Sequence, residues 1–179
     1  MYISEKSNEI NAIKDILDLI DIQGCTITID AIGTQKDIIN KIVKKEGDYI
    51  LQVKSNQGGT LLELEEHFKP FYKNEIIKIE QTEADHGRVE TRMMESIIEP
   101  LRFSDIECYR NLNKWNELHS IHKMIRIRYD KKKEEESVEV SYYISSHTAQ
   151  EEVFKMIREH WAVENNLHYC LDVILNEDH

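Results

Sequence analysis

A row of potential ligands lies along one predicted helix near the C-terminal end of the sequence. His160, Glu164, His168 and Asp172 are each four residues apart, so they lie about one turn from each other along a single helical stripe. Neither Gly nor Pro interrupts residues 158–172, and the Ala, Leu and Glu residues there favour a helix. Burying a carboxylate between imidazoles is costly unless something binds there. The spacing therefore predicts a binding site whose chemistry needs a second carboxylate from elsewhere in the chain.

The second carboxylate is expected at the end of a strand. The β-branched run 25–30 predicts a strand that closes on Asp30, and binding sites in an open α/β sheet gather at the carboxyl ends of the strands. Asp30 could hold a cation there, within reach of the helix, or it could only cap the following turn. A Zn or Fe site formed by the helix alone is a competing hypothesis. Its ligands, His160, Glu164 and His168, spread over about two turns, which is too far for one ion.

The first half of the sequence predicts alternating helices and strands. Apolar residues at helical spacing follow Ser7 and Asn8, either of which can be the N-cap of a first helix. A second helix is expected to open with Thr34 as its N-cap, and a third to begin after a break at Gly58 and Gly59. The expected strands are 25–30 and 48–54, and the expected third helix is 61–68. This order indicates a βαβ unit with a parallel sheet.

The second half of the sequence has a different pattern, in which apolar and polar residues alternate. This period of two predicts antiparallel strands. The four predicted strands are 76–80, 88–98, 121–129 and 138–145, with an exposed hairpin tip at 131–136. A β-rich segment therefore separates the βαβ unit from the long C-terminal helix.

Composition limits the class of protein. A chain of 179 residues suits one domain, and no apolar run approaches the roughly 20 residues that span a bilayer, so we expect a cytoplasmic protein. The net charge of −11 argues against a general nucleic-acid binder, although it leaves room for a local basic groove. It also suits a protein that binds divalent cations through carboxylates. The three cysteines form no Cys-x-x-Cys pair, so neither a disulfide framework nor a zinc knuckle is expected.

Polar residues follow the second predicted strand. Lys54, Asn56 and Gln57 lie at the same kind of strand end as Asp30. They could line a groove beside it, or they could serve ordinary turn formation.

A second polar group lies in the β-rich segment. Arg88, Glu90 and Arg92 alternate, so they share one face of a strand, and Arg can clamp phosphates through two hydrogen bonds. The alternative is a salt-bridged, solvated face. The same alternative applies to the further positive charges in the segment, Lys123, Arg126 and Arg128.

Five motifs, taken in order, resemble those of the DDE transposases of bacterial insertion sequences, specifically the H-repeat-associated group. They are Thr28-Ile29-Asp30-Ala31-Ile32-Gly33-Thr34-Gln35; Asp48-Tyr49 with Lys54-x-Asn56-Gln57; His86-Gly87-Arg88-x-Glu90-x-Arg92; Tyr142-Tyr143-Ile144-Ser145-Ser146; and Arg158-x-His160-Trp161-x-Val163-Glu164-Asn165-x-Leu167-His168 with Leu171-Asp172-Val173 and Glu177-Asp178. Each motif alone is modest, but together they cover nearly the whole chain.

The resemblance implies an α/β fold of the ribonuclease-H type, in which three acids hold two Mg²⁺ (or Mn²⁺) ions for DNA hydrolysis and strand transfer. Asp30 matches the second acid of the family and Glu164 the third. Residues 1–75 would be the first part of the core, 76–146 a β-rich insertion and 147–179 the acidic helix that completes the core. The expected partner is DNA, at transposon ends and at the target. Residues expected to face DNA are Lys54, Asn56, Gln57, His86, Arg88, Arg92, Arg158, His160 and Trp161, and those expected to support the metal ligands are His168 and Asp172.

One departure from the family pattern concerns the first acid. In the family it lies in an Asp-Gly-Lys segment on an earlier strand, and no Asp-Gly pair occurs in this sequence. We therefore expect a transposase piece truncated at both ends, with impaired chemistry and an exposed sheet edge that favours a homodimer. The alternative is a non-catalytic remnant that binds DNA or another transposase subunit.

Overall fold

The computed structural model describes residues 5–70, 75–85, 87–99 and 110–169, with no account of the side chains of 5–7, 85 and 163–169. In chain order the helices and strands are α1 (Glu5–Leu19), β1 (Thr26–Ile29), α2 (Lys36–Lys44), β2 (Asp48–Val53), α3 (Gly58–His67), β3 (Ile77–Asp85), β4 (Arg88–Ile98), β5 (Ser120–Asp130), β6 (Glu135–Ser145) and α4 (Gln150–Tyr169). Three single-turn 3₁₀ helices are η1 (Ala31–Gly33), η2 (Ser55–Gln57) and η4 (Leu112–Lys114).

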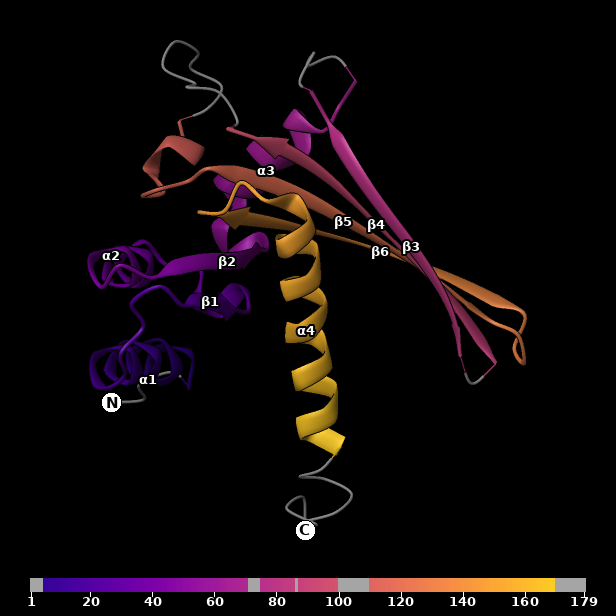
Figure 1. The fold of residues 1–179 in the computed structure, drawn as a ribbon, viewed down its shortest axis with the longest axis horizontal. Helices are drawn as coiled ribbons and strands as arrows, with labels where there is room; N and C mark the ends of the chain where they lie inside the picture. Colours follow the sequence, from indigo (N-terminus) through magenta and orange to yellow (C-terminus); the bar gives the residue numbers. More distant parts are fainter. Residues whose placement is uncertain (1–4, 71–74, 86, 100–109, 170–179) are drawn as a thin grey trace.

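All six strands belong to one sheet in the order β1-β2-β6-β5-β4-β3 (Figure 1). The β1 and β2 strands are parallel, which confirms the predicted βαβ unit. The β3, β4, β5 and β6 strands pair antiparallel, as the alternating pattern predicts, and β6 joins β2 antiparallel. The β-rich segment therefore extends the sheet of the βαβ unit. The mixed α/β architecture is confirmed.

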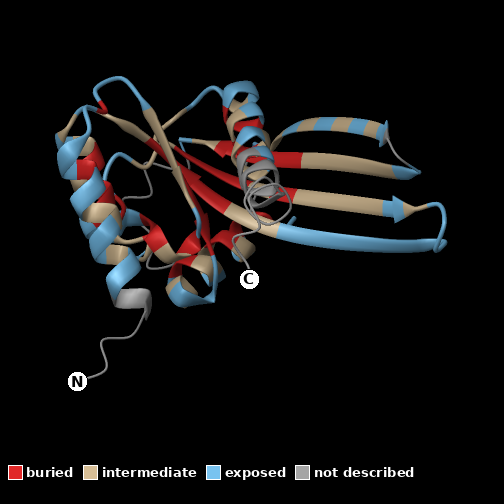
Figure 2. Ribbon diagram, turned by 90° about the horizontal axis from the view of Figure 1, so that it is seen from below, coloured by how far each residue is buried: buried red, intermediate tan, exposed pale blue. Residues whose placement is uncertain are grey.

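Helices cover the two faces of the sheet unequally. The larger apolar cluster joins α1, α2 and α3 to one face, and includes Ile39 of α2, Leu51 of β2 and Ile121 of β5. The smaller cluster packs α4 alone against the other face, through Val153 and Ile157. In Figure 1 α4 crosses the strands, and Figure 2 shows that β3 to β6 project beyond all the helices. Within the described part of the chain, the face beneath α4 is therefore covered only where α4 crosses it.

Three predicted helix starts are wrong. The first helix begins at Glu5, before Ser7 and Asn8. Thr34 does not cap α2: the cap position is Gln35, and the Thr34 hydroxyl instead donates to the Gln52 carbonyl oxygen at 2.6 Å. Tertiary contacts decide that geometry more than local cap preference does.

The glycine pair also differs from the prediction. Gly58 and Gly59 are the first residues of α3, and no break precedes Leu61. A glycine costs about 1 kcal/mol in a helix interior, and less in a first turn that is anchored by its neighbours.

Among the described residues, no helix is both long and apolar enough to cross a membrane.

Candidate active site

Asp30 is the first residue after β1, where the chain turns into η1. Its backbone is extended, and its Oδ1 accepts a hydrogen bond from the Ala31 amide at 2.6 Å. The same oxygen accepts from the Lys54 ammonium at 3.2 Å. The Asp30 side chain is nevertheless 59% exposed. Asp30 therefore caps its turn, as one reading of the sequence expected, and still presents a carboxylate that solvent reaches.

Side chains from the second strand end hold the Asp30 turn in place. The Asn56 amide donates to the Ala31 carbonyl oxygen at 2.6 Å, and the Gln57 amide donates to the Thr34 carbonyl oxygen at 2.8 Å. Gly33 packs so tightly that a Cβ there would lie 2.3 Å from the Ile29 Cγ2. The turn is thus fixed through its backbone. Asn56 and Gln57 serve turn formation, and a role for them toward DNA is a separate proposal.

The α4 helix lies beside this turn and meets the sheet through polar contacts. His160 Nδ1 shares a hydrogen bond of 3.1 Å with the Thr28 hydroxyl on β1. The Trp161 indole donates to the Tyr143 hydroxyl on β6 at 3.2 Å. Burial raises the pKa of Tyr143, so this phenol stays protonated at neutral pH. These contacts fix the rotation of α4 about its own axis.

Asp30 and α4 enclose a small hollow of about 50 Å³, which we call the acid pocket. Its lining residues are Thr28, Ile29, Asp30, Ile50, Gln52, Lys54, Tyr143, Ile157, His160 and Trp161. The structure therefore brings together Asp30, Lys54, His160 and Trp161, four of the predicted site residues.

Several other predicted site residues lie wholly or partly outside the described part of the chain. Glu164 and His168 belong to α4, and Glu164 is one turn after His160, but their side chains are not described. Asp172 and His86 lie outside the described residues altogether. Within the described part of the chain, no three His, Cys, Asp or Glu side chains come together as a metal site.

A second, wider hollow lies on the same sheet face, beyond α4. This arginine groove occupies about 530 Å³ and is lined by Glu90, Arg92, Met124, Arg126, Arg128, Glu139, Ser141, Ile157, Arg158, Trp161 and Ala162. Ile157 and Trp161 line both hollows. The Arg126 guanidinium lies over the Trp161 ring, 4.9 Å from its centroid. One wall therefore separates the arginine groove from the acid pocket.

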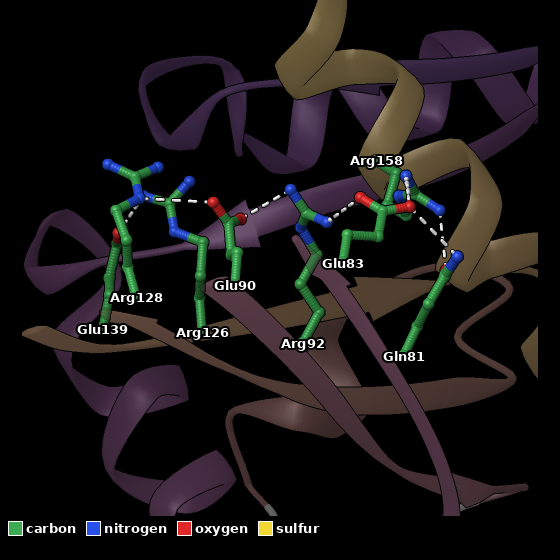
Figure 3. Close-up of polar contacts among 8 residues, drawn as sticks. All are labelled: Gln81, Glu83, Glu90, Arg92, Arg126, Arg128, Glu139 and Arg158. Atoms are coloured by element: carbon green, nitrogen blue, oxygen red, sulfur yellow. Dashed lines mark hydrogen bonds and ion pairs between the residues drawn. The ribbon is translucent and has the colours of Figure 1, made fainter. Parts of the chain in front are cut away.

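Glu83 and Glu90 link Arg158, Arg92 and Arg128, and with the separate Arg126–Glu139 pair beside them these side chains form a row (Figure 3). Arg92 bridges Glu83 at 2.9 Å and Glu90 at 2.5 Å. Arg128 contacts the other oxygen of Glu90 at 3.2 Å, and Arg126 pairs with Glu139. Figure 3 shows the row reaching α4, where Arg158 donates to the carboxylate of Glu83 at 2.7 Å and to the side-chain oxygen of Gln81 at 2.6 Å.

These contacts agree with the alternative hypothesis for Arg88, Glu90 and Arg92, in which they form a salt-bridged face. A hydrogen bond from Arg92, opposed by burial and helped by the charge of Arg158, lowers the pKa of Glu83. Arg88 lies apart from the row, 60% exposed, with its Nε 3.6 Å from an oxygen of Asp130. Arg88, Glu90 and Arg92 share a face, as predicted from their alternation, but only the last two line the arginine groove.

Several site residues could not be found from the sequence. Thr28 and Tyr143 face α4, and Glu83 and Glu139 complete the row, although none was singled out for chemistry. Their alternation on strands was readable, but the register that aligns Gln81, Arg92, Arg126 and Glu139 across four strands was not.

Comparison with known proteins shows the family. The family model described as "Transposase DDE domain" matches residues 2–179. The chain is 41% identical to "Putative transposase YncI" of Escherichia coli O157:H7, over 97% of this chain and 44% of that protein. It is 40% identical to "H repeat-associated putative transposase YhhI" of Escherichia coli K12, over 97% of this chain and 46% of that protein. No solved structure matches the chain.

The chain thus spans less than half the length of these curated relatives. The match covers both strand ends, the β-rich segment and α4 together. The resemblance that the motifs suggested is confirmed, and the chain belongs to the DDE transposase family.

Proposed function

We propose that this chain supplies part of the catalytic core of a transposase, which cuts and joins DNA phosphodiesters with divalent metal ions held by Asp30 and Glu164. One observation carries the proposal. The half-exposed carboxylate of Asp30 lines a hollow whose opposite wall is the α4 surface formed by Ile157, His160 and Trp161. Glu164 follows one turn later on α4. The proposal thus assigns two acids from distant parts of the sequence to one site.

The donors of the acid pocket suit a hard cation. The Asp30 carboxylate and the Gln52 side chain supply oxygen atoms, which Mg²⁺ and Mn²⁺ prefer. When bound, such ions activate a water or a 3′-hydroxyl and stabilise charge on the leaving oxygen. The role of the chain is to position the two carboxylates, through the fixed Asp30 turn and the fixed rotation of α4. His160 contributes by tying α4 to β1 through Thr28.

Lys54 has two roles in this proposal. Its ammonium neutralises Asp30 while no metal ion is bound, and the pair is exposed enough to open at small cost. Once Asp30 binds a metal ion, the freed ammonium can contact a phosphate at the same strand end. The proposed partner is DNA, at transposon ends and at the target, and the proposed location is the cytoplasm beside the nucleoid.

Calorimetry with Mn²⁺ and Mg²⁺ tests the proposal on the chain and on the variants Glu164→Gln and Asp30→Asn. Each variant removes one anionic ligand, so each should weaken metal binding at least tenfold. Glu159→Gln is the matched control, because Glu159 lies exposed on the same helix and pairs with Lys155 at 3.7 Å. It should bind metal as the unaltered chain does.

Binding that all four proteins share equally would contradict this assignment of the acids. If none of them binds metal, the alternative function gains support, namely a non-catalytic module that binds DNA or another transposase subunit. The homodimer is tested separately. β1 ends the sheet among the described residues, so sedimentation of the chain should show a dimer if its open edge pairs, and a clean monomer would contradict that proposal.

A further inference from the structure

We propose that the arginine groove binds consecutive phosphates of the DNA strand that leads into the acid pocket, and that a phosphate replaces Glu139 while Glu90 stays in place. The inference rests on the proposed function only for the identity of the polyanion as DNA. The proposal gives roles to Arg126, Arg128, Glu90 and Glu139 that the family membership does not assign.

The groove carries positive charge in excess within an acidic chain. Four arginines of the row (Arg92, Arg126, Arg128 and Arg158) face three glutamates (Glu83, Glu90 and Glu139). The whole chain, by contrast, has a net charge of −11. Each guanidinium has five N–H donors, so an ion pair with one carboxylate leaves donors for a further anion. Arginine is also the side chain whose planar fork best matches a phosphate.

Glu90 and Glu139, which both line the groove, differ in how firmly they are held. Glu90 is 17% exposed and lies between two guanidiniums, those of Arg92 and Arg128. Removing this carboxylate takes a contact from two guanidiniums at once, and that of Arg92 is only 23% exposed, so the loss is costly. Glu139, in contrast, is 47% exposed, and it pairs with one arginine. Exposed ion pairs contribute little, so a phosphate can take the place of Glu139 at small cost.

The geometry favours a polyanion with regularly spaced charges. Arg126 and Arg128 are two residues apart on β5 and share its face, which places their Cα atoms about 6.8 Å apart along the strand. This separation is similar to that of neighbouring phosphates in a nucleic-acid strand. Arg126 is already oriented by the Trp161 ring, 4.9 Å away. It therefore loses little side-chain freedom when it binds an anion.

The wall shared by the two hollows gives the bound strand its direction. Trp161 and Ile157 line the arginine groove on one side and the acid pocket on the other. A backbone that contacts Arg128 and then Arg126 continues past Trp161 toward Asp30. Phosphates bound in the groove would thus place the next phosphodiester at the carboxylates.

The first arm of the test removes arginines. Fluorescence anisotropy of a short labelled DNA duplex is measured over a range of salt concentrations, with EDTA present so that no metal contributes. Arg126→Ala and Arg128→Ala should each weaken binding roughly three- to tenfold and lower the slope of log K against log salt by about one. Arg126→Lys, which keeps the charge, should retain most of that slope. Lys44→Ala removes an exposed positive charge from α2, remote from the groove, and should have no such effect.

The second arm replaces one glutamate at a time with glutamine, so that the net charge changes by the same amount in every variant. Glu139→Gln, Glu90→Gln and Glu9→Gln each remove one negative charge, and Glu9 lies exposed on α1, far from the groove in sequence. We expect Glu139→Gln to bind the duplex at least threefold more tightly than Glu9→Gln, because a competitor for Arg126 is gone. Glu90→Gln should bind more weakly than Glu9→Gln, because two arginines lose their fixed positions. A purely general charge effect would raise affinity equally in all three variants.

The proposal is overturned if the arginine variants bind DNA as the unaltered chain does, or if the three glutamate variants behave alike. The same holds if the duplex does not bind at all, which would leave the groove to an acidic protein surface. Circular dichroism melting of each variant separates loss of binding from loss of folding. Because these measurements exclude metal, they can fail while Asp30 and Glu164 still bind metal, and they can succeed while those acids do not.

Discussion

The Asp30 turn and the arginine groove lie on either side of one tryptophan, yet they are held by different kinds of contact. At the turn, the amides of Asn56 and Gln57 donate to backbone carbonyl oxygens. In the groove, as far as the described residues show, side chains bind other side chains, as Arg126 binds Glu139. Backbone atoms cannot move without moving the chain, whereas two exposed charged side chains can exchange partners freely.

This difference fits the two tasks that we propose. A carboxylate that must meet a second acid at metal-ligand distance needs a fixed base, because small displacements of a ligand weaken a metal site. A surface that must accept a long flexible polyanion needs cations that are oriented but not permanently neutralised. The first region should therefore respond to substitution with losses of stability, and the second with changes of affinity.

The largest stability effect is expected at His122, whose side chain is buried on β5. Its Nδ1 shares a hydrogen bond of 2.8 Å with Ser96 and its Nε2 one of 2.7 Å with Ser120. Burial, with a smaller contribution from the charge of His147, lowers the pKa of His122 to about 3. The unfolded chain binds this proton near pH 6.5, so the neutral folded form is fully favoured above that pH and loses stability as the pH falls toward 3.

Unfolding by urea at pH 7 and pH 4.5 measures this dependence. Between those values His122 should remove on the order of 2 kcal/mol from the free energy of unfolding. His122→Gln, which keeps a polar side chain and cannot titrate, should show a weaker dependence by that amount. Equal pH dependence in both proteins would mean that other groups account for the loss.

The next largest effect separates two glycines. A Cβ at Gly33 would lie 2.3 Å from the Ile29 Cγ2, so Gly33→Ala must push η1 away from β1 and should cost about 2 kcal/mol. A Cβ at Gly58 would meet no atom within 4 Å, and its φ of −53° is helical. Gly58→Ala should therefore be neutral or stabilise α3 by about 0.5 kcal/mol. Urea unfolding of both variants measures the contrast, and metal binding by Gly33→Ala should also weaken, since Asp30 moves with the turn.

The two regions also differ in how far the sequence predicts them. The β-branched run before Asp30 and the apolar periodicity of α2 predict the βαβ unit, because short-range patterns determine those elements. The groove depends on pairs such as Arg128 and Glu90, which are 38 residues apart and meet only through the register of β4 and β5. Register is set by packing over the whole sheet, so single-strand patterns predict that these arginines share a face but not which carboxylates they meet.

The smallest expected effects compare the two regions directly. Asn56→Ala removes a hydrogen bond to the Ala31 carbonyl oxygen and should cost about 1 kcal/mol of stability. Glu139→Gln removes one exposed ion pair and should change stability by less than about 0.5 kcal/mol. Metal affinity should fall in Asn56→Ala and stay constant in Glu139→Gln, whereas DNA affinity without metal should change only in Glu139→Gln. If Glu139→Gln destabilised the chain as much as Asn56→Ala, the groove would be a structural ion-pair network, and Glu139 would not be exchangeable for a phosphate.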